Sequence, residues 1–153
     1  MKTFQKNIIL FIAQGAYSGR FPVAPGTAGS VIGVLLYLGI KDFPPAFYLI
    51  FLGMLCLTGA LVSTEAEKIL GSKDNCSIVI DEIAGFLVAM FLVPYGWGFL
   101  IAGFLLFRFF DIMKPWPIRK VERFSGGWGV MLDDIGAGIY TNVVLQIFAA
   151  FLA

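Results

Sequence analysis

The sequence predicts an all-α fold: a small polytopic membrane bundle of about four to five transmembrane helices, with an N-terminal helix that is interfacial or partly inserted. Three observations support this prediction. Hydrophobic residues make up 59% of the 153 residues and charged residues 14%, against about 45–50% and about 25% in soluble domains. The mean hydropathy is +0.88. Four long stretches carry no charge, namely 21–40, 43–64, 83–107 and 135–153. We expect one domain covering residues 1–153.

These stretches divide into helices once turns and prolines are considered. The N-terminal segment has an apolar core of only six residues, 8–13, which predicts a helix at the interface rather than a span. A Gly/Pro-rich segment opens the first stretch, and a turn at 94–98 splits the third. The expected spans are about 28–40, 46–63, 78–93, 97–112 and 134–153.

The basic residues predict the orientation, because Lys and Arg concentrate on the cytoplasmic side of membrane proteins. With the N-terminus in the cytoplasm, ten of the eleven basic residues lie inside and only Lys41 lies outside. We therefore expect residues 64–77 and 113–132 on the cytoplasmic face. Residues 41–45 and 94–97 are expected on the opposite face.

Composition excludes several classes of function. The chain has no histidine, which removes Ser-His-Asp and Cys-His catalysis, His-ligated zinc and haem with a proximal histidine. A net charge of +1 gives no support for nucleic-acid binding. Two cysteines, Cys56 and Cys76, form neither a disulfide framework nor a zinc site by themselves.

Five acidic residues interrupt the edges of the apolar segments, where an ionised side chain is costly. They are Asp81, Glu82, Asp111, Asp133 and Asp134. Oxygen ligands without histidine or cysteine favour a hard cation such as Mg²⁺. Two other interpretations stay open: acids at helix ends also mark the water boundary or cap a helix, and acids inside membranes also line ion paths in transporters and channels.

Basic and glycine-rich segments accompany the acids. Arg108, Asp111 and Lys114 share one face of a helix, because residues three apart are neighbours there. The segment 24–30, Ala-Pro-Gly-Thr-Ala-Gly-Ser, precedes a helix, and its amides with Thr27 and Ser30 form a candidate anion site. A tight turn followed by close helix packing is the alternative interpretation of that segment.

Four ordered blocks carry a resemblance to a known family. They are PVAPGTAGS (22–30), SIVIDEIAGF (77–86), FRFFDIMKPWPI (107–118) and GGWGVMLDDIGAG (126–138). With these blocks the chain resembles the phosphatidylglycerophosphatase A family of bacterial membrane lipid phosphatases, over nearly its whole length. The resemblance implies Mg²⁺-dependent hydrolysis of phosphatidylglycerophosphate to phosphatidylglycerol and phosphate. It also implies a multi-pass protein of the bacterial inner membrane with its site on the cytoplasmic face.

The expected site follows from these residues. We expect Mg²⁺ to be held by the five acids, with Asp111, Asp81, Asp134 and Arg108 as the catalytic group. Phosphate oxygens would be bound by Thr27, Ser30, Arg108, Lys114 and Arg119. Metal-activated water is favoured over an aspartate as nucleophile, because the DxDx(T/V) pattern of aspartyl-phosphate enzymes is absent. The expected partners are the membrane and the lipid substrate, and the oligomeric state stays open. A transporter, a channel or another metal-dependent phospholipid headgroup enzyme is the alternative.

Overall fold

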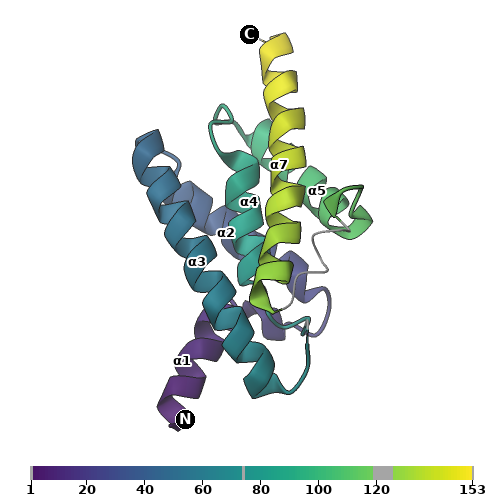
Figure 1. The fold of residues 1–153 in the computed structure, drawn as a ribbon. Coiled ribbons are helices and arrows are strands. Elements are labelled where there is room, and N and C mark those ends of the chain that lie inside the picture. Colours follow the sequence, from purple (N-terminus) through teal and green to yellow (C-terminus); the bar gives the residue numbers. More distant parts are fainter. Residues whose placement is uncertain (1, 74, 119–125, 153) are drawn as a thin grey trace.

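The computed structural model describes residues 2–73, 75–118 and 126–152, and within these ranges all the regular secondary structure is helical. Figure 1 shows the long helices running side by side, with the two chain ends at opposite ends of the molecule. The all-α expectation is thereby confirmed. The elements are α1 (Thr3–Ala13), the 3₁₀ turn η1 (Ser18–Arg20), α2 (Pro25–Ile40), α3 (Pro45–Leu70), α4 (Ile80–Met90), α5 (Trp97–Met113) and α7 (Gly127–Leu152).

Prolines and left-handed residues set several of the helix ends. Pro25 and Pro45 each occupy the first position of a helix, where the missing N–H costs nothing. Gly71 ends α3 in the left-handed conformation, with φ of 71°. Lys114 ends α5 in the same region, and the following Pro115 disfavours continuation of the helix through the residue before it.

The short helix α4 is the centre of the bundle and packs against α2, α3, α5 and α7. Figure 1 shows it between α3 and α7. Glycines allow the close approach of the backbones: a side-chain carbon on Gly138 of α7 would meet the carbonyl oxygen of Gly85 on α4. Small residues at such a contact are typical of helix packing in membranes. Phe86 and Phe107 fill the core beside this contact, with ring centroids 6.2 Å apart.

The last carbonyls of α4 are bonded by a neighbouring helix. Asn142 of α7 donates from Nδ2 to the carbonyl oxygens of Ala89, at 3.0 Å, and Phe91, at 2.7 Å. Helix ends leave carbonyls without partners, which is costly in an apolar environment. This side chain therefore allows α4 to end inside the bundle.

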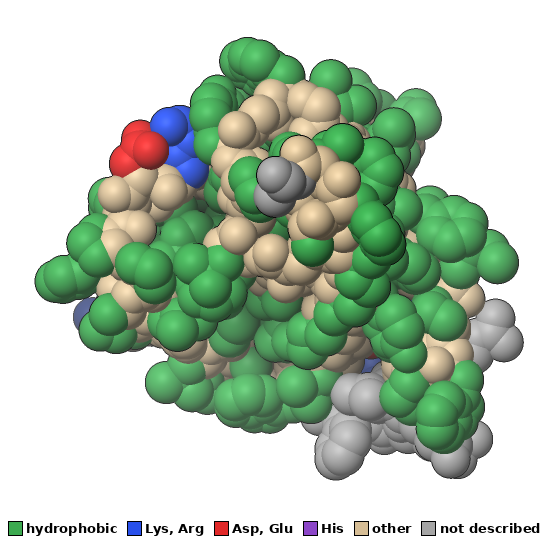
Figure 2. Space-filling model, turned by 90° about the horizontal axis from the view of Figure 1, so that it is seen from above, with side chains coloured by type: hydrophobic (Ala, Val, Ile, Leu, Met, Phe, Trp, Pro, Cys, Tyr) green, Lys and Arg blue, Asp and Glu red, His purple; other side chains and the backbone are tan. Residues whose placement is uncertain are grey.

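Two helices, α3 and α7, are long and apolar enough to cross a membrane. Each has 26 residues, which is about 39 Å at 1.5 Å per residue, against a hydrocarbon core of about 30 Å. Large hydrophobic side chains such as Leu57, Val143 and Phe151 are exposed on their outer faces. Figure 2 looks at the end of the molecule where α7 terminates, and hydrophobic side chains cover most of that view.

The helix bounds differ from the expected spans in three places. α2 begins at Pro25 rather than near residue 28, because proline starts the helix within the Gly/Pro-rich segment. α3 continues to Leu70, through charged residues that follow its apolar part. The third expected span, 78–93, contains only the 11 residues of α4, about 16 Å of helix. The number of spans therefore stays a prediction.

Candidate active site

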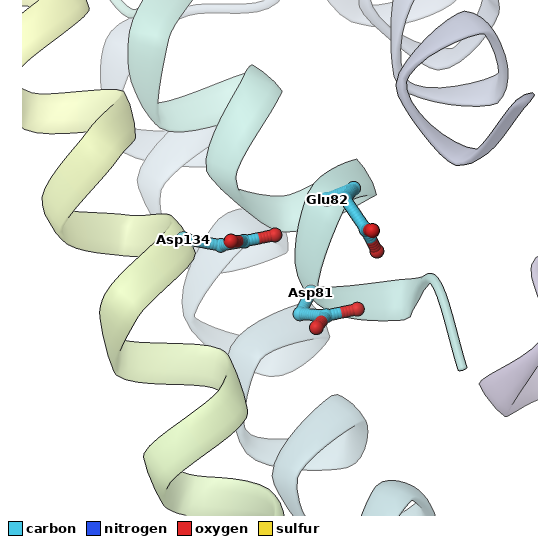
Figure 3. A group of neighbouring side chains, drawn as sticks. All are labelled: Asp81, Glu82 and Asp134. Carbon is cyan, nitrogen blue, oxygen red and sulfur yellow. The ribbon is translucent and has the colours of Figure 1, made fainter. Parts of the chain in front are cut away.

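Three carboxylates from two helices meet near the beginning of α4. Asp81 and Glu82 lie in its first turn, and Asp134 lies in the second turn of α7 and points toward them (Figure 3). One carboxylate oxygen of each lies within 4.8 Å of the other two. Asp81 and Asp134 are only 5% and 3% exposed, so water contributes little to their solvation.

Buried oxygen atoms in this cluster lack hydrogen-bond donors. Among the described residues, Asp81 Oδ1, Glu82 Oε2 and Asp134 Oδ2 are each buried without a partner. Buried polar atoms nearly always have partners in folded proteins, and carboxylates this close together repel one another. A bound cation would satisfy both requirements, so these three oxygen donors could hold a metal ion.

The other two predicted acids are held by basic side chains. Arg108 Nη1 lies 2.5 Å from Asp111 Oδ2, one helical turn away on α5. Lys114 Nζ lies 2.5 Å from Asp133 Oδ2 on α7. The carboxylate of Asp134 is within electrostatic range of all four other acids, so the five belong to one charged region.

Glycine 26 brings the beginning of α2 against this region. A side-chain carbon at Gly26 would lie 3.1 Å and 3.2 Å from the two terminal nitrogens of Arg108, and closer still to Glu82 Oε1. Backbone thus occupies the space next to the guanidinium and the carboxylate, where any side chain would intrude. The glycine-rich segment is therefore a wall of the charged region.

The two hydroxyls of this segment differ in their surroundings. Ser30 is fully buried and donates to the carbonyl oxygen of Gly26 at 2.9 Å, so its proton is engaged within α2. Thr27 is partly exposed and lines a groove on the outer side of α2. Arg119 lies outside the described residues.

One face predicted from the sequence does not form. Arg108 and Asp111 pair across one turn as expected from their spacing, but Lys114 leaves the helix in the left-handed conformation, with φ of 42°. Its side chain therefore contacts Asp133 of α7 rather than Asp111. Sequence reasoning also missed the contact of Gly26 with Arg108, which depends on how α2 and α5 are placed around α4.

A comparison with protein families gives a match to a sequence model described as Phosphatidylglycerophosphatase A, over residues 11–149. The chain belongs to the phosphatidylglycerophosphatase A family. Membership makes it an enzyme of the phosphatase class, and its two long apolar helices indicate association with a membrane.

Relatives agree with this assignment. The chain is 40% identical over 147 residues to Phosphatidylglycerophosphatase A of Haemophilus influenzae, covering 91% of this chain and 87% of that protein. It is 35% identical over 136 residues to the protein of the same name in Escherichia coli K12, covering 88% and 79%. A Bacteroides thetaiotaomicron relative named Putative phosphatidylinositol-3-phosphatase is 36% identical over 151 residues, covering 90% and 91%. No solved structure matches the chain.

All four sequence blocks that carry the resemblance lie within the span of the family match. Three of them supply the charged region, through Gly26, through Asp81 with Glu82, and through Arg108 with Asp111. The fourth supplies Asp133 and Asp134. The phosphatidylglycerophosphatase A blocks thus converge on one charged region.

Proposed function

We propose that this phosphatidylglycerophosphatase A family member hydrolyses the phosphomonoester of phosphatidylglycerophosphate, giving phosphatidylglycerol and inorganic phosphate. The observation that carries the proposal is the buried cluster of Asp81, Glu82 and Asp134, in which one oxygen of each carboxylate lacks a donor and Glu82 lies beside the Arg108 guanidinium. A doubly charged cation and an arginine are what a phosphate group needs around it. The names of the Haemophilus influenzae and Escherichia coli relatives support this substrate.

The three clustered carboxylates are proposed to hold Mg²⁺. When bound, the ion supplies charge neutralisation for phosphate oxygens and acidity for the attacking water. Asp111 and Asp133, expected as ligands from the sequence, are engaged with Arg108 and Lys114 in the described geometry. We propose that the main role of Asp111 and Asp133 is to hold the Arg108 and Lys114 side chains toward the substrate. Ligation of the metal is their secondary role.

Phosphate binding is assigned to the cations and the glycine-rich wall. Arg108 offers the planar fork that matches two phosphate oxygens, and Lys114 adds a second positive charge. Thr27 and Arg119 are proposed to contact phosphate from α2 and from the segment after α5. Ser30 would contribute only after giving up its bond to Gly26, so its main contribution is to fix the first turn of α2.

Water is the proposed nucleophile. It attacks phosphorus, the bond from phosphorus to the glycerol oxygen breaks, and that oxygen leaves with a proton. Asp111 is the alternative nucleophile, but its Oδ2 is held by Arg108 at 2.5 Å, which draws the electron pair away from phosphorus. Uncatalysed hydrolysis of phosphate monoesters is extremely slow, so the site must supply a large stabilisation of charge in the transition state.

We propose a multi-pass protein of the bacterial inner membrane, with this site on the cytoplasmic face. Five passes, α2, α3, α4, α5 and α7, agree with the distribution of basic residues. α4 is too short to cross alone and is completed by the non-helical residues after Met90. Non-helical backbone is tolerated at membrane depth where other parts of the protein satisfy its hydrogen bonds. Here Asn142 donates to the carbonyl oxygens of Ala89 and Phe91.

Phosphate release by the purified protein tests the proposal. Phosphatidylglycerophosphate, phosphatidic acid and a phosphatidylinositol monophosphate are presented in mixed micelles, with Mg²⁺ and with chelator. We expect phosphatidylglycerophosphate to release phosphate when Mg²⁺ is present and not in chelator. Faster release from the inositol lipid would instead assign the substrate class named for the Bacteroides thetaiotaomicron relative, and full turnover in chelator would exclude the metal.

A further inference from the structure

A groove runs along the outer side of the chain from η1 to the first turns of α2. Its volume is about 410 Å³. Phe21 and Val23 are 61% and 71% exposed beside it. The residues that line it include Phe21, Val23, Thr27, Ala28, Val31 and Ile32. Apart from the hydroxyls of Thr27 and of Ser18, which also lines it, the groove's side chains offer only hydrocarbon.

One residue of the groove adjoins the candidate active site along the chain. Thr27 lines the groove, and its neighbour Gly26 lies against Arg108 and Glu82. The groove and the wall of the charged region are thus formed by adjacent residues in the first turn of α2.

A fixed positive charge belongs to the same segment. Arg20 is not itself a lining residue, but in the sequence it lies between Ser18 and Phe21, both of which line the groove. Its Nε donates to Gln14 Oε1 at 2.8 Å, and its guanidinium lies 4.1 Å from the centre of the Tyr17 ring. Arg20 is exposed, and within the described residues its two terminal nitrogens make no hydrogen bond.

The orientation of this arginine is set by a buried amide. Gln14 is only 2% exposed, and its Nε2 donates to Ser77 Oγ at 2.9 Å. Ser77 in turn donates to Asn75 Oδ1 at 2.7 Å. A buried polar side chain is costly unless its hydrogen bonds are made. Gln14 makes them with Ser77 on one side and with the exposed Arg20 on the other. The free edge of the guanidinium is therefore presented in a defined direction.

We propose that the groove holds a phospholipid, with an acyl chain along Phe21, Val31 and Ile32 and the phosphodiester on Arg20. A planar guanidinium with two free donors matches two oxygens of a phosphate, and the apolar lining matches an acyl chain. The inference rests on the proposed function, because it presents the terminal phosphomonoester of the same lipid to the acidic cluster. It assigns recognition of the diester to a residue outside the catalytic group.

Substrates with and without the diester test the role of Arg20. Phosphatidylglycerophosphate has both phosphates, whereas phosphatidic acid has only the monoester. For Arg20→Leu we expect the KM for phosphatidylglycerophosphate to rise about tenfold, with kcat within about twofold of wild type. Phosphatidic acid should be hydrolysed as by wild type. Lys6→Leu is the matched control, since Lys6 is an exposed cation of α1 whose ammonium makes no hydrogen bond within the described residues.

A second pair of variants tests the groove. Val31→Trp places a large ring in the groove, and Leu57→Trp places the same ring on the exposed face of α3. Native mass spectrometry measures the binding of dioleoyl-phosphatidylglycerol, which has the diester and no monoester. We expect Val31→Trp and Arg20→Leu to bind it at least about fivefold more weakly than Leu57→Trp and Lys6→Leu.

The outcomes separate the two proposals. If wild type hydrolyses the lipid but Arg20→Leu behaves as Lys6→Leu does, the groove assignment is wrong and the proposed function stands. If wild type releases no phosphate and the groove variants still bind phosphatidylglycerol weakly, the function is wrong and the lipid groove stands. Inhibition of wild type and Arg20→Leu by inorganic phosphate gives a further outcome. If Arg20→Leu weakens this inhibition as much as it weakens the binding of phosphatidylglycerol, Arg20 binds free phosphate and the lipid assignment is overturned.

Discussion

Replacement of Asp81 by asparagine should have opposite effects on stability with and without a divalent cation. One carboxylate oxygen of each of Asp81, Glu82 and Asp134 lies within 4.8 Å of the other two. At an effective dielectric constant of about 20, each ionised pair repels by about 3.5 kcal/mol. Asp81→Asn removes two of the three repelling pairs. The repulsion removed is about 7 kcal/mol before proton uptake and water reduce it. If about 2 kcal/mol of relief survives, the melting temperature in chelator rises by about 4–8 °C.

Thermal unfolding in detergent, with chelator and with Mg²⁺, measures both effects. Wild type should gain stability from Mg²⁺, because the ion binds only the folded protein. Asp81→Asn should start higher in chelator and gain much less. Asp42→Asn is the control, because that carboxylate is 86% exposed and paired with Lys41. A lower melting temperature for Asp81→Asn in chelator, or an equal gain from Mg²⁺ in both proteins, would refute the reasoning.

Three further predictions address the site, the orientation and the packing. Asp111→Asn should lose at least about 100-fold in turnover, about 2.7 kcal/mol, while Asp42→Asn stays near wild type; retention of more than about a third of the turnover would remove Asp111 from the reaction. Cys76 is an exposed native cysteine, so an impermeant thiol reagent should label it in inside-out vesicles and not in intact cells; labelling of intact cells would reverse the topology. Gly138→Val should unfold at lower temperature, because its side chain meets the Gly85 carbonyl; unchanged melting would contradict the packing.

Helix positions could be predicted well where composition alone decides them. The expected helix 97–112 is α5, Trp97–Met113, because an apolar segment lies between a turn and Pro115. The end of α3 was missed because the apolar stretch stops at Thr64, whereas the helix continues to the glycine at 71. Hydropathy reports the part of a helix that can lie in lipid, and it is silent about helix that extends into water.

The acidic character of the cluster could be predicted from the sequence, but the pairing of its residues could not. The three acids that cluster are among the five that the sequence singles out, because charge is conspicuous in an apolar chain. Which of them meet depends on the close contact of α4 with α7 at Gly85 and Gly138, and this contact is tertiary. Likewise the bond from Arg20 to Gln14 depends on the turn between α1 and α2, which has no periodic signal.

Binding of Mn²⁺ followed by electron paramagnetic resonance tests the central claim most directly, that Asp81, Glu82 and Asp134 hold the divalent cation used by the enzyme. Wild type in chelator-treated detergent solution should bind Mn²⁺ tightly, release it to excess Mg²⁺, and lose at least about tenfold in affinity in Asp134→Asn. Asp42→Asn should bind as wild type does. Unchanged Mn²⁺ affinity in Asp134→Asn, with turnover still dependent on the ion, would contradict the account and place the metal elsewhere.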